Sequence, residues 1–140
     1  PGTAVLVKKK GQAVAKADQA ICVGGTPETG GKSKIATLLP VRVGPKDIMT
    51  VSTHFIWDGA AEQRLHHARL VGEHLAEPSA IVGGDFNCMP GEHLTQLESS
   101  SFLGKLRRAE LPANNCMTGL TGDLRQQVCI DHVYVSPDLQ

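Results

Sequence analysis

The segment at residues 80–88 constrains the fold of this chain more than any other. An apolar run, Ala80-Ile81-Val82, leads directly into Gly83-Gly84-Asp85-Phe86-Asn87-Cys88. An apolar run bounded by glycines predicts a buried strand. Because side chains alternate along a strand, Asp85 and Asn87 are expected on one face and Phe86 on the other. A carboxylate and a carboxamide would then lie side by side, where they can hold a metal ion or orient a water molecule.

Two further strand-like segments each carry one polar group. Residues 48–55 are rich in β-branched side chains and bring His54 to the far end of their strand. Residues 128–136 form an apolar run, predicted as a single strand, with Asp131 inside it. A carboxylate is costly in such a strand unless it is paired, hydrogen-bonded or bound to a metal. The sequence therefore predicts that His54, Asp85, Asn87 and Asp131 cluster at one end of the sheets.

The remaining pattern is a run of strands with few helices. Strand signals fall at residues 3–9, 20–25, 34–43 and 47–55, and Pro40 predicts an edge position or a bulge in the third. From Asp58, which suits a helix N-cap, apolar residues recur every three to four positions as far as Leu75. A shorter helix is predicted over residues 91–97. This combination favours an α/β layered sandwich.

Three motifs in order, Ser-Thr-His-Phe, Gly-Asp-Phe-Asn and Ile-Asp-His-Val-Tyr-Val-Ser, resemble the endonuclease/exonuclease/phosphatase superfamily. The helical run after Glu62-Gln63-Arg64 is similar to the helix between the first two motifs in that family. The resemblance implies a four-layer α/β sandwich of the DNase I-like type. It extends from about Gly2 to Asp138 and matches the second half of such a domain. Residues 1–140 are thus expected to form a partial domain, without the closing Ser-Asp-His segment or the metal-binding glutamate of the first half.

The resemblance also implies a chemistry, which is hydrolysis of phosphodiesters, most often in nucleic acids, with Mg²⁺ or Mn²⁺ as cofactor. Asp85 would bind the metal and orient the attacking water, and Asn87 would contact the scissile phosphate. His54 would donate to a phosphate oxygen, and Asp131 would orient the closing histidine. The isolated chain is expected to be inactive, with an uncovered sheet face that needs the missing half-domain or another protein chain.

A non-catalytic reading stays open beside the enzymatic one. The absence of the glutamate and the closing histidine favours a fragment, or a scaffold subunit with the same fold in a larger assembly. The substrate also stays open, because members of the resembling family act on DNA, RNA, phosphoinositides, sphingolipids and protein–DNA adducts. No residue pattern here reads a base or a lipid headgroup.

Charge is balanced overall but unevenly distributed. Residues 1–46 carry eight Lys or Arg against two acids, a net +6, and residues 47–140 carry six against twelve, a net −6. A polyanionic substrate that meets a divalent cation would suit this division, although basic residues also occur simply as solvated faces. The zero net charge argues against a dedicated high-affinity nucleic-acid binder.

The cysteines and remaining histidines predict structural roles. Cys88 and Cys129 are expected to be buried thiols, which favours a reducing, intracellular compartment. The helix histidines, His66, His67 and His74, are expected on a solvated polar face. His132 should point away from Asp131 and serve the structure. No apolar run approaches the roughly 20 residues of a membrane span.

Overall fold

The computed structural model describes residues 5, 13–15, 19–24, 34–56, 61–75, 78–110, 119–120 and 127–139. The strands are β1 (Ala13–Ala15), β2 (Gln19–Gly24), β3 (Lys34–Val43), β4 (Lys46–His54), β5 (Ser79–Asp85), β6 (Arg107–Arg108), β7 (Gly119–Leu120), β8 (Gln127–Val128) and β9 (Asp131–Val135). The helices are α1 (Ala61–Glu73) and α2 (Glu92–Ser99), with 3₁₀ turns η2 (Phe102–Lys105) and η3 (Pro137–Leu139).

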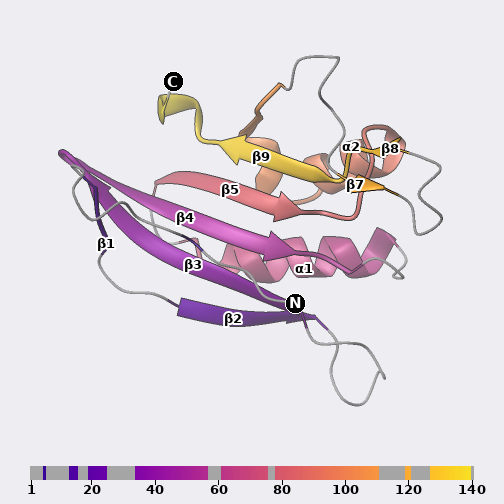
Figure 1. The fold of residues 1–140 in the computed structure, drawn as a ribbon, viewed down its shortest axis with the longest axis horizontal. Helices are drawn as coiled ribbons and strands as arrows, with labels where there is room; N and C mark the ends of the chain where they lie inside the picture. The colour runs from indigo at the N-terminus through magenta and orange to yellow at the C-terminus, as the bar shows by residue number, and fades with distance from the viewer. Residues whose placement is uncertain are drawn as a thin grey trace.

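A mixed seven-stranded sheet forms the centre of the fold (Figure 1). Its order is β1-β3-β4-β5-β9-β6, and β2 pairs with β3 on the same side as β1. β4 and β5 run parallel, joined through α1, and β9 returns antiparallel on the other side of β5. β7 and β8 form a separate two-stranded sheet. The carboxyl ends of β4 and β5 therefore lie beside the start of β9.

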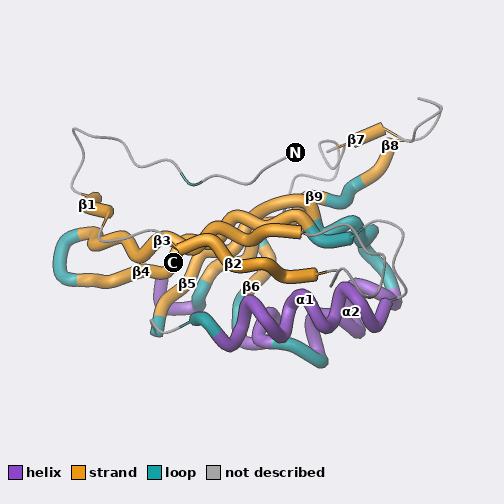
Figure 2. Tube along the Cα trace, turned by 90° about the horizontal axis from the view of Figure 1, so that it is seen from below, coloured by secondary structure: helices purple, strands orange, loops and turns teal. Residues whose placement is uncertain are grey.

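Both helices cover one face of the sheet (Figure 2). Alternate residues of β3, β4, β5 and β9 point toward them and are buried, as the period of two in a strand requires. This core contains Ala36, Leu38, Met49, Val51, Phe55, Ala68, Val71, Ala80, Val82, Phe86, Cys88, Leu94, Leu97, Leu103 and Tyr134. In the part of the chain described, neither helix is long and apolar enough to cross a membrane.

The opposite face of the sheet carries a different set of side chains. Ile35 and Val133 are 46% and 44% exposed there, although both are large and apolar. His54, Asp85 and Asp131 are partly exposed and belong to the same alternating set as Val133. These three polar groups thus lie on the face away from the helices.

Most predicted elements match the structure closely. The segment at 34–43 is β3, and the segments at 47–55 and 20–25 correspond to β4 and β2. The predicted edge position of Pro40 was wrong, because β3 pairs with β4 on one side and with β1 and β2 on the other. On that second side Pro40 falls between the two pairings, since the register of β1 ends at Val41 and that of β2 begins at Leu38. The predicted strand at 3–9 and the Asp58 cap fall outside the described residues.

One predicted element is wrong. Residues 128–136 do not form one strand, because there is a break in strand structure between β8 and β9. The two strands belong to different sheets. Cys129 and Ile130 lie at this break. The apolar run hid the break because its composition is strand-like on both sides. The three-residue strand β1 was not predicted, since Ala-Val-Ala is too short to give a signal.

Candidate active site

The ends of three adjacent strands bring three of the candidate residues into one row. In the sheet register His54 of β4 is opposite Asp85 of β5, and Asp85 is in turn opposite Asp131 of β9. Residues that pair across neighbouring strands place their side chains on the same face. The structure therefore gathers His54, Asp85 and Asp131, as the sequence predicted, at the end where β4 and β5 finish (Figure 1).

Two side chains of this row, and a lysine beside them, have polar atoms close to one another. Nε2 of His54 lies 3.6 Å from Oδ2 of Asp85, and the two side chains are 32% and 28% exposed. Nζ of Lys34 lies 3.2 Å from the same Nε2. An imidazole, a carboxylate and an ammonium group thus converge at a site that solvent reaches.

Asp85 has a raised pKa. Burial is the largest cause, and the negative charge of Asp131 adds to it, while the backbone N–H of Asn87 and the charges of His54 and Lys34 act in the opposite direction. A raised pKa makes the ionised carboxylate a stronger base than an ordinary aspartate.

The carboxylates of Asp85 and Asp131 are of the ligand type that divalent cations prefer. A cation beside Asp85 would relieve the repulsion from Asp131 that contributes to the raised pKa. Mg²⁺ prefers carboxylate oxygens and needs only one or two from the protein, because it keeps several waters. Among the described residues no group of three or more His, Cys, Asp and Glu side chains is placed to hold a metal.

Asn87 reaches the site by a different route from the one predicted. β5 ends at Asp85, and Asn87 adopts a left-handed backbone conformation with φ +48°. Its N–H donates to Oδ1 of Asp85 at 2.8 Å, and its Nδ2 donates to the carbonyl of Phe55 at 2.8 Å. The expectation that Asp85 and Asn87 share a strand face was therefore wrong, because a turn replaces the strand. Asn87 is buried and ties the chain after β5 to the chain after β4.

The row rests on tight packing just behind it. A Cβ atom added to Gly84, whose φ is +143°, would lie 1.9 Å from the carbonyl oxygen of Thr53. At Gly83 an added Cβ would make only ordinary contact, 3.7 Å from Val133. Phe55 and Phe86, the residues that follow β4 and β5, pack edge to face at 5.0 Å. Of these two adjacent glycines, Gly84 is the one that the backbone requires.

His132 and His67 both lie in the core. His132 points away from Asp131 as predicted, is 6% exposed, and its Nε2 lies 2.7 Å from the carbonyl of Cys88. His67 was expected on a solvated face but is 2% exposed and packs edge to face on Phe55. Burial lowers the pKa of His67 to about 4, helped by His66 and Lys34. The expectation holds for the exposed His66 and His74, but it was wrong for His67, which lies on the buried side of α1 with Ala68 and Val71.

The two strand-end cysteines differ from each other. Cys88 is a buried free thiol as predicted, and burial raises its pKa. Cys129 is disulfide-bonded, so its prediction as a free thiol was wrong. It lies at the break between β8 and β9 rather than inside a continuous strand. The argument from free thiols to a reducing compartment no longer holds.

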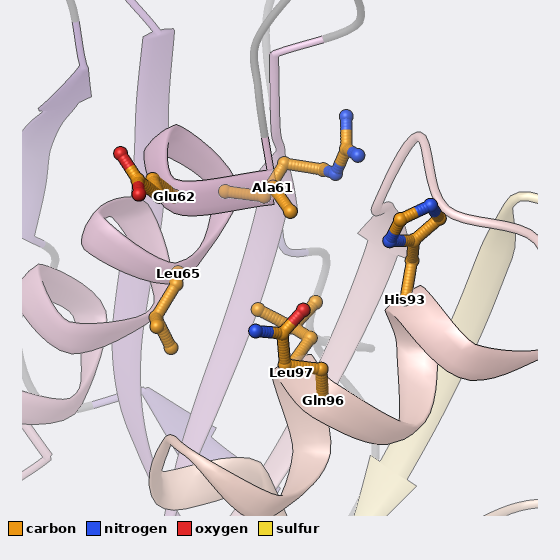
Figure 3. A pocket seen from close by; sticks show the side chains of 7 residues that line it. Ala61, Glu62, Leu65, His93, Gln96 and Leu97 are labelled. Atoms are coloured by element: carbon orange, nitrogen blue, oxygen red, sulfur yellow. The ribbon is translucent and has the colours of Figure 1, made fainter.

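A small pocket on the helix side is separate from this row. It has a volume of about 30 Å³ and is lined by Ala61, Glu62, Arg64, Leu65, His93, Gln96 and Leu97. Figure 3 shows that its walls come from α1 and α2. A space of this size holds about one water molecule and no substrate.

Sequence reasoning missed the position of Lys34. It counted Lys34 only among the basic residues of the first third of the chain. The available signal was the strand pairing, since Lys34 begins β3, and the neighbouring strand β4 ends at His54.

Comparison with solved structures gives the same fold. The chain is similar to an endonuclease/exonuclease/phosphatase family protein from Bacteroides thetaiotaomicron, with 19% identity, a TM-score of 0.67, and coverage of 91% of this chain and 52% of that one. It is also similar to a mannosyl-6-phosphatase from the same organism, with 18% identity, a TM-score of 0.65, and coverage of 90% and 54%. D. rerio TDP2 in complex with a single-stranded DNA product has 11% identity, a TM-score of 0.62, and coverage of 89% and 54%.

These likenesses establish the fold. No protein-family model matches the sequence, and no curated protein matches it. The chain spans about half the length of the solved structures that it resembles. Its mixed sheet and two helices therefore constitute a partial DNase I-like α/β fold, as the sequence motifs predicted.

Proposed function

We propose that this chain, which has the fold of part of an endonuclease/exonuclease/phosphatase domain, contributes catalytic residues to a divalent-metal-dependent phosphodiesterase that acts on nucleic acid. The row of His54, Asp85 and Asp131 across β4, β5 and β9 carries the proposal. The similar structure of D. rerio TDP2, which holds a single-stranded DNA product, supports nucleic acid as the substrate class. The similar mannosyl-6-phosphatase supports a phosphoester more generally.

Asp85 is the proposed base that orients the attacking water. Its Oδ1 already accepts the N–H of Asn87, which fixes the carboxylate, while Oδ2 faces His54. Partial burial raises its pKa, so the ionised group attracts a proton more strongly than an exposed aspartate would. A water held by this carboxylate would be positioned for in-line attack on phosphorus.

His54 and Asn87 are the proposed donors to the phosphoryl group. Donors that are already positioned stabilise charge that develops on oxygen in the transition state. Nδ2 of Asn87 uses one hydrogen for Phe55, and an amide nitrogen carries a second that can reach a phosphoryl oxygen. Asn87 would then combine a structural hydrogen bond with a substrate contact.

Asp85 is also the proposed protein ligand for Mg²⁺, with Asp131 as the neighbouring carboxylate. When bound, the cation would supply positive charge against the charge that develops on the phosphoryl oxygens. Asp131 adds negative charge beside Asp85 and so favours both cation binding and a basic Asp85. In the family that the sequence resembles, the equivalent of Asp131 orients a histidine, and we propose that role in the complete protein.

A non-catalytic scaffold is the second candidate function. The similar solved structures show the fold, which such a scaffold would share with the enzymes. In that case the fold would serve assembly, and His54, Asp85 and Asp131 would have no catalytic role. The two candidates differ in whether replacing Asp85 changes any activity.

The test uses the full-length protein that contains this chain. It is assayed with Mg²⁺, with Mn²⁺ and with a chelator on single-stranded DNA, RNA, a small phosphodiester and a phosphomonoester. We expect metal-dependent cleavage of nucleic acid, and we expect Asp85→Ala to lower kcat by about 10² to 10⁴, the usual contribution of a general base. The monoester tests whether the protein is a phosphatase rather than a phosphodiesterase.

Asp47→Ala is the matched control. Asp47 lies near the start of β4, at the opposite end of the strand from His54, where it pairs with Arg42 at 2.8 Å. This variant should keep wild-type activity. Equal rates for wild type and Asp85→Ala would remove Asp85 from the mechanism, and no hydrolysis of any of the four substrates would favour the scaffold.

A further inference from the structure

Lys34 makes a contact at the site that the proposed mechanism does not use. Its Nζ lies 3.2 Å from Nε2 of His54. Lys34 is the first residue of β3, and β3 pairs along its length with β4, which ends at His54. The ammonium group therefore reaches across the end of the neighbouring strand, and its side chain is partly buried there.

Lys34 and Asp85 compete for a hydrogen bond with Nε2 of His54. An ammonium group can only donate, whereas the ionised carboxylate of Asp85, 3.6 Å from the same nitrogen, can only accept. Nε2 can accept from Lys34 or donate toward Asp85, but it cannot do both at once. Whenever Nε2 carries its proton, Lys34 and His54 present two donors 3.2 Å apart, and the structure shows no side chain among the described residues that accepts from both. A single anionic oxygen would accept from both.

Lys34 forms no ion pair with a carboxylate within the described part of the chain. Its positive charge nevertheless contributes to the pKa of Asp85. Lys46 provides the contrast, because its Nζ lies 3.1 Å from a carboxylate oxygen of Asp138. Hydrogen bonds from a charged donor to a phosphoryl oxygen are among the stronger kinds in proteins.

We propose that Lys34 and His54 bind one and the same non-bridging phosphoryl oxygen, so that Lys34 is a phosphate-binding residue of this site. The inference rests on the proposed function for its substrate class and adds a residue to it. Lys34 would hold the phosphoryl group over Asp85. Its ammonium group would donate to the phosphoryl oxygen whether or not Nε2 of His54 carries a proton. The loss of Lys34 should therefore weaken the binding of phosphate itself, before any chemistry.

Inorganic phosphate is the probe for a test that needs no turnover. It is titrated into the protein in the presence of a chelator, and binding is followed by the backbone amide resonances and by the imidazole Cε1–H resonance of His54. We expect saturable shifts at Lys34 and His54 in the wild type. Lys34→Met should raise the Kd for phosphate about tenfold, the effect of losing one charge-assisted hydrogen bond, and Lys34→Arg should retain most of the affinity.

Lys46→Met is the matched control, since it removes a lysine of the same sheet that already has a partner. It should bind phosphate like the wild type. Lys34→Gln replaces the methionine variant if that variant does not give a folded spectrum. Wild-type affinity in both neutral variants, or shifts that appear away from His54, would overturn the proposal.

Activity measurements separate this inference from the proposed function. Phosphate binding that depends on Lys34 in a protein that hydrolyses no phosphoester would keep the anion site and refute the hydrolase. Hydrolysis that depends on Asp85 but has unchanged kcat/KM in Lys34→Met would support the hydrolase and refute the role of Lys34. Where both are right, Lys34→Met should raise KM more than it lowers kcat, because phosphate binding precedes the transition state.

Discussion

Replacing Gly84 with alanine should destabilise the protein strongly, because this glycine lets β5 approach β4 directly behind the site. The new Cβ would lie 1.9 Å from the carbonyl oxygen of Thr53 and 2.9 Å from its carbonyl carbon. Thr53 is only 2% exposed, so its backbone has no room to retreat. Restoring ordinary contact would move the strands apart by more than about 1 Å.

The magnitude follows from two separate costs. Gly84 has φ +143°, a region that alanine rarely adopts, and such backbone strain costs about 1–3 kcal/mol. Overpacking a tightly filled interior adds about 1–3 kcal/mol more. The free energy of unfolding should therefore fall by about 2–6 kcal/mol, which is a large part of the total for an ordinary domain.

Urea denaturation followed by circular dichroism measures this difference, with Gly83→Ala as the matched control. The two glycines are neighbours in β5, yet a Cβ at Gly83 would lie 3.7 Å from a methyl of Val133. Gly83→Ala should be neutral or stabilising by up to about 1 kcal/mol, since it restricts only the unfolded chain. A Gly84→Ala variant within about 0.5 kcal/mol of wild type would refute the close-approach argument.

Two further predictions concern the core. The pKa of His67 is lowered from 6.5 to about 4 in the folded state, so the unfolded state binds more protons as the pH falls through this range and stability is lost with it. His67→Phe, compared with wild type in urea unfolding at pH 7 and pH 4, should remove up to about 3 kcal/mol of that loss, whereas parallel curves would contradict the prediction. The hydroxyl of Tyr134 donates to Oε1 of Glu98 at 3.0 Å, so Tyr134→Phe should cost about 1 kcal/mol at pH 7, and no change would show that the bond contributes nothing net.

The sequence predicted the site better than it predicted the path of the chain around it. His54 and Asp85 follow from strand ends, because an apolar or β-branched run and its terminal polar residue are local features. Asp131 was expected inside a strand and instead begins β9. Asn87 could not be placed in this way, since its left-handed conformation depends on the hydrogen bonds to Asp85 and Phe55. The alternation of side chains between the two faces stops where the strand ends. The end of β5 is set by its pairing with β4 and β9, which stops at Asp85.

Burial of single polar residues was the other blind spot. His67 lies between Arg64 and Arg69 in sequence, yet the turn of α1 aims it at Phe55 rather than at solvent. The disulfide of Cys129 depends on where the chain goes after β8, which a run of apolar residues does not reveal. These features are set by tertiary contacts, and a single sequence carries little trace of them.

The row across β4, β5 and β9 has a kinetic consequence. β4 and β5 can pair as soon as α1 has formed, but Asp131 reaches Asp85 only when β9 docks, across a separation of 46 positions. Contacts between distant segments form slowly, because a long loop must close first. During synthesis the carboxylate pair therefore has to wait until β9 has left the ribosome. Any charge repulsion between the two aspartates is met only when β9 docks, after β4 and β5 have already paired.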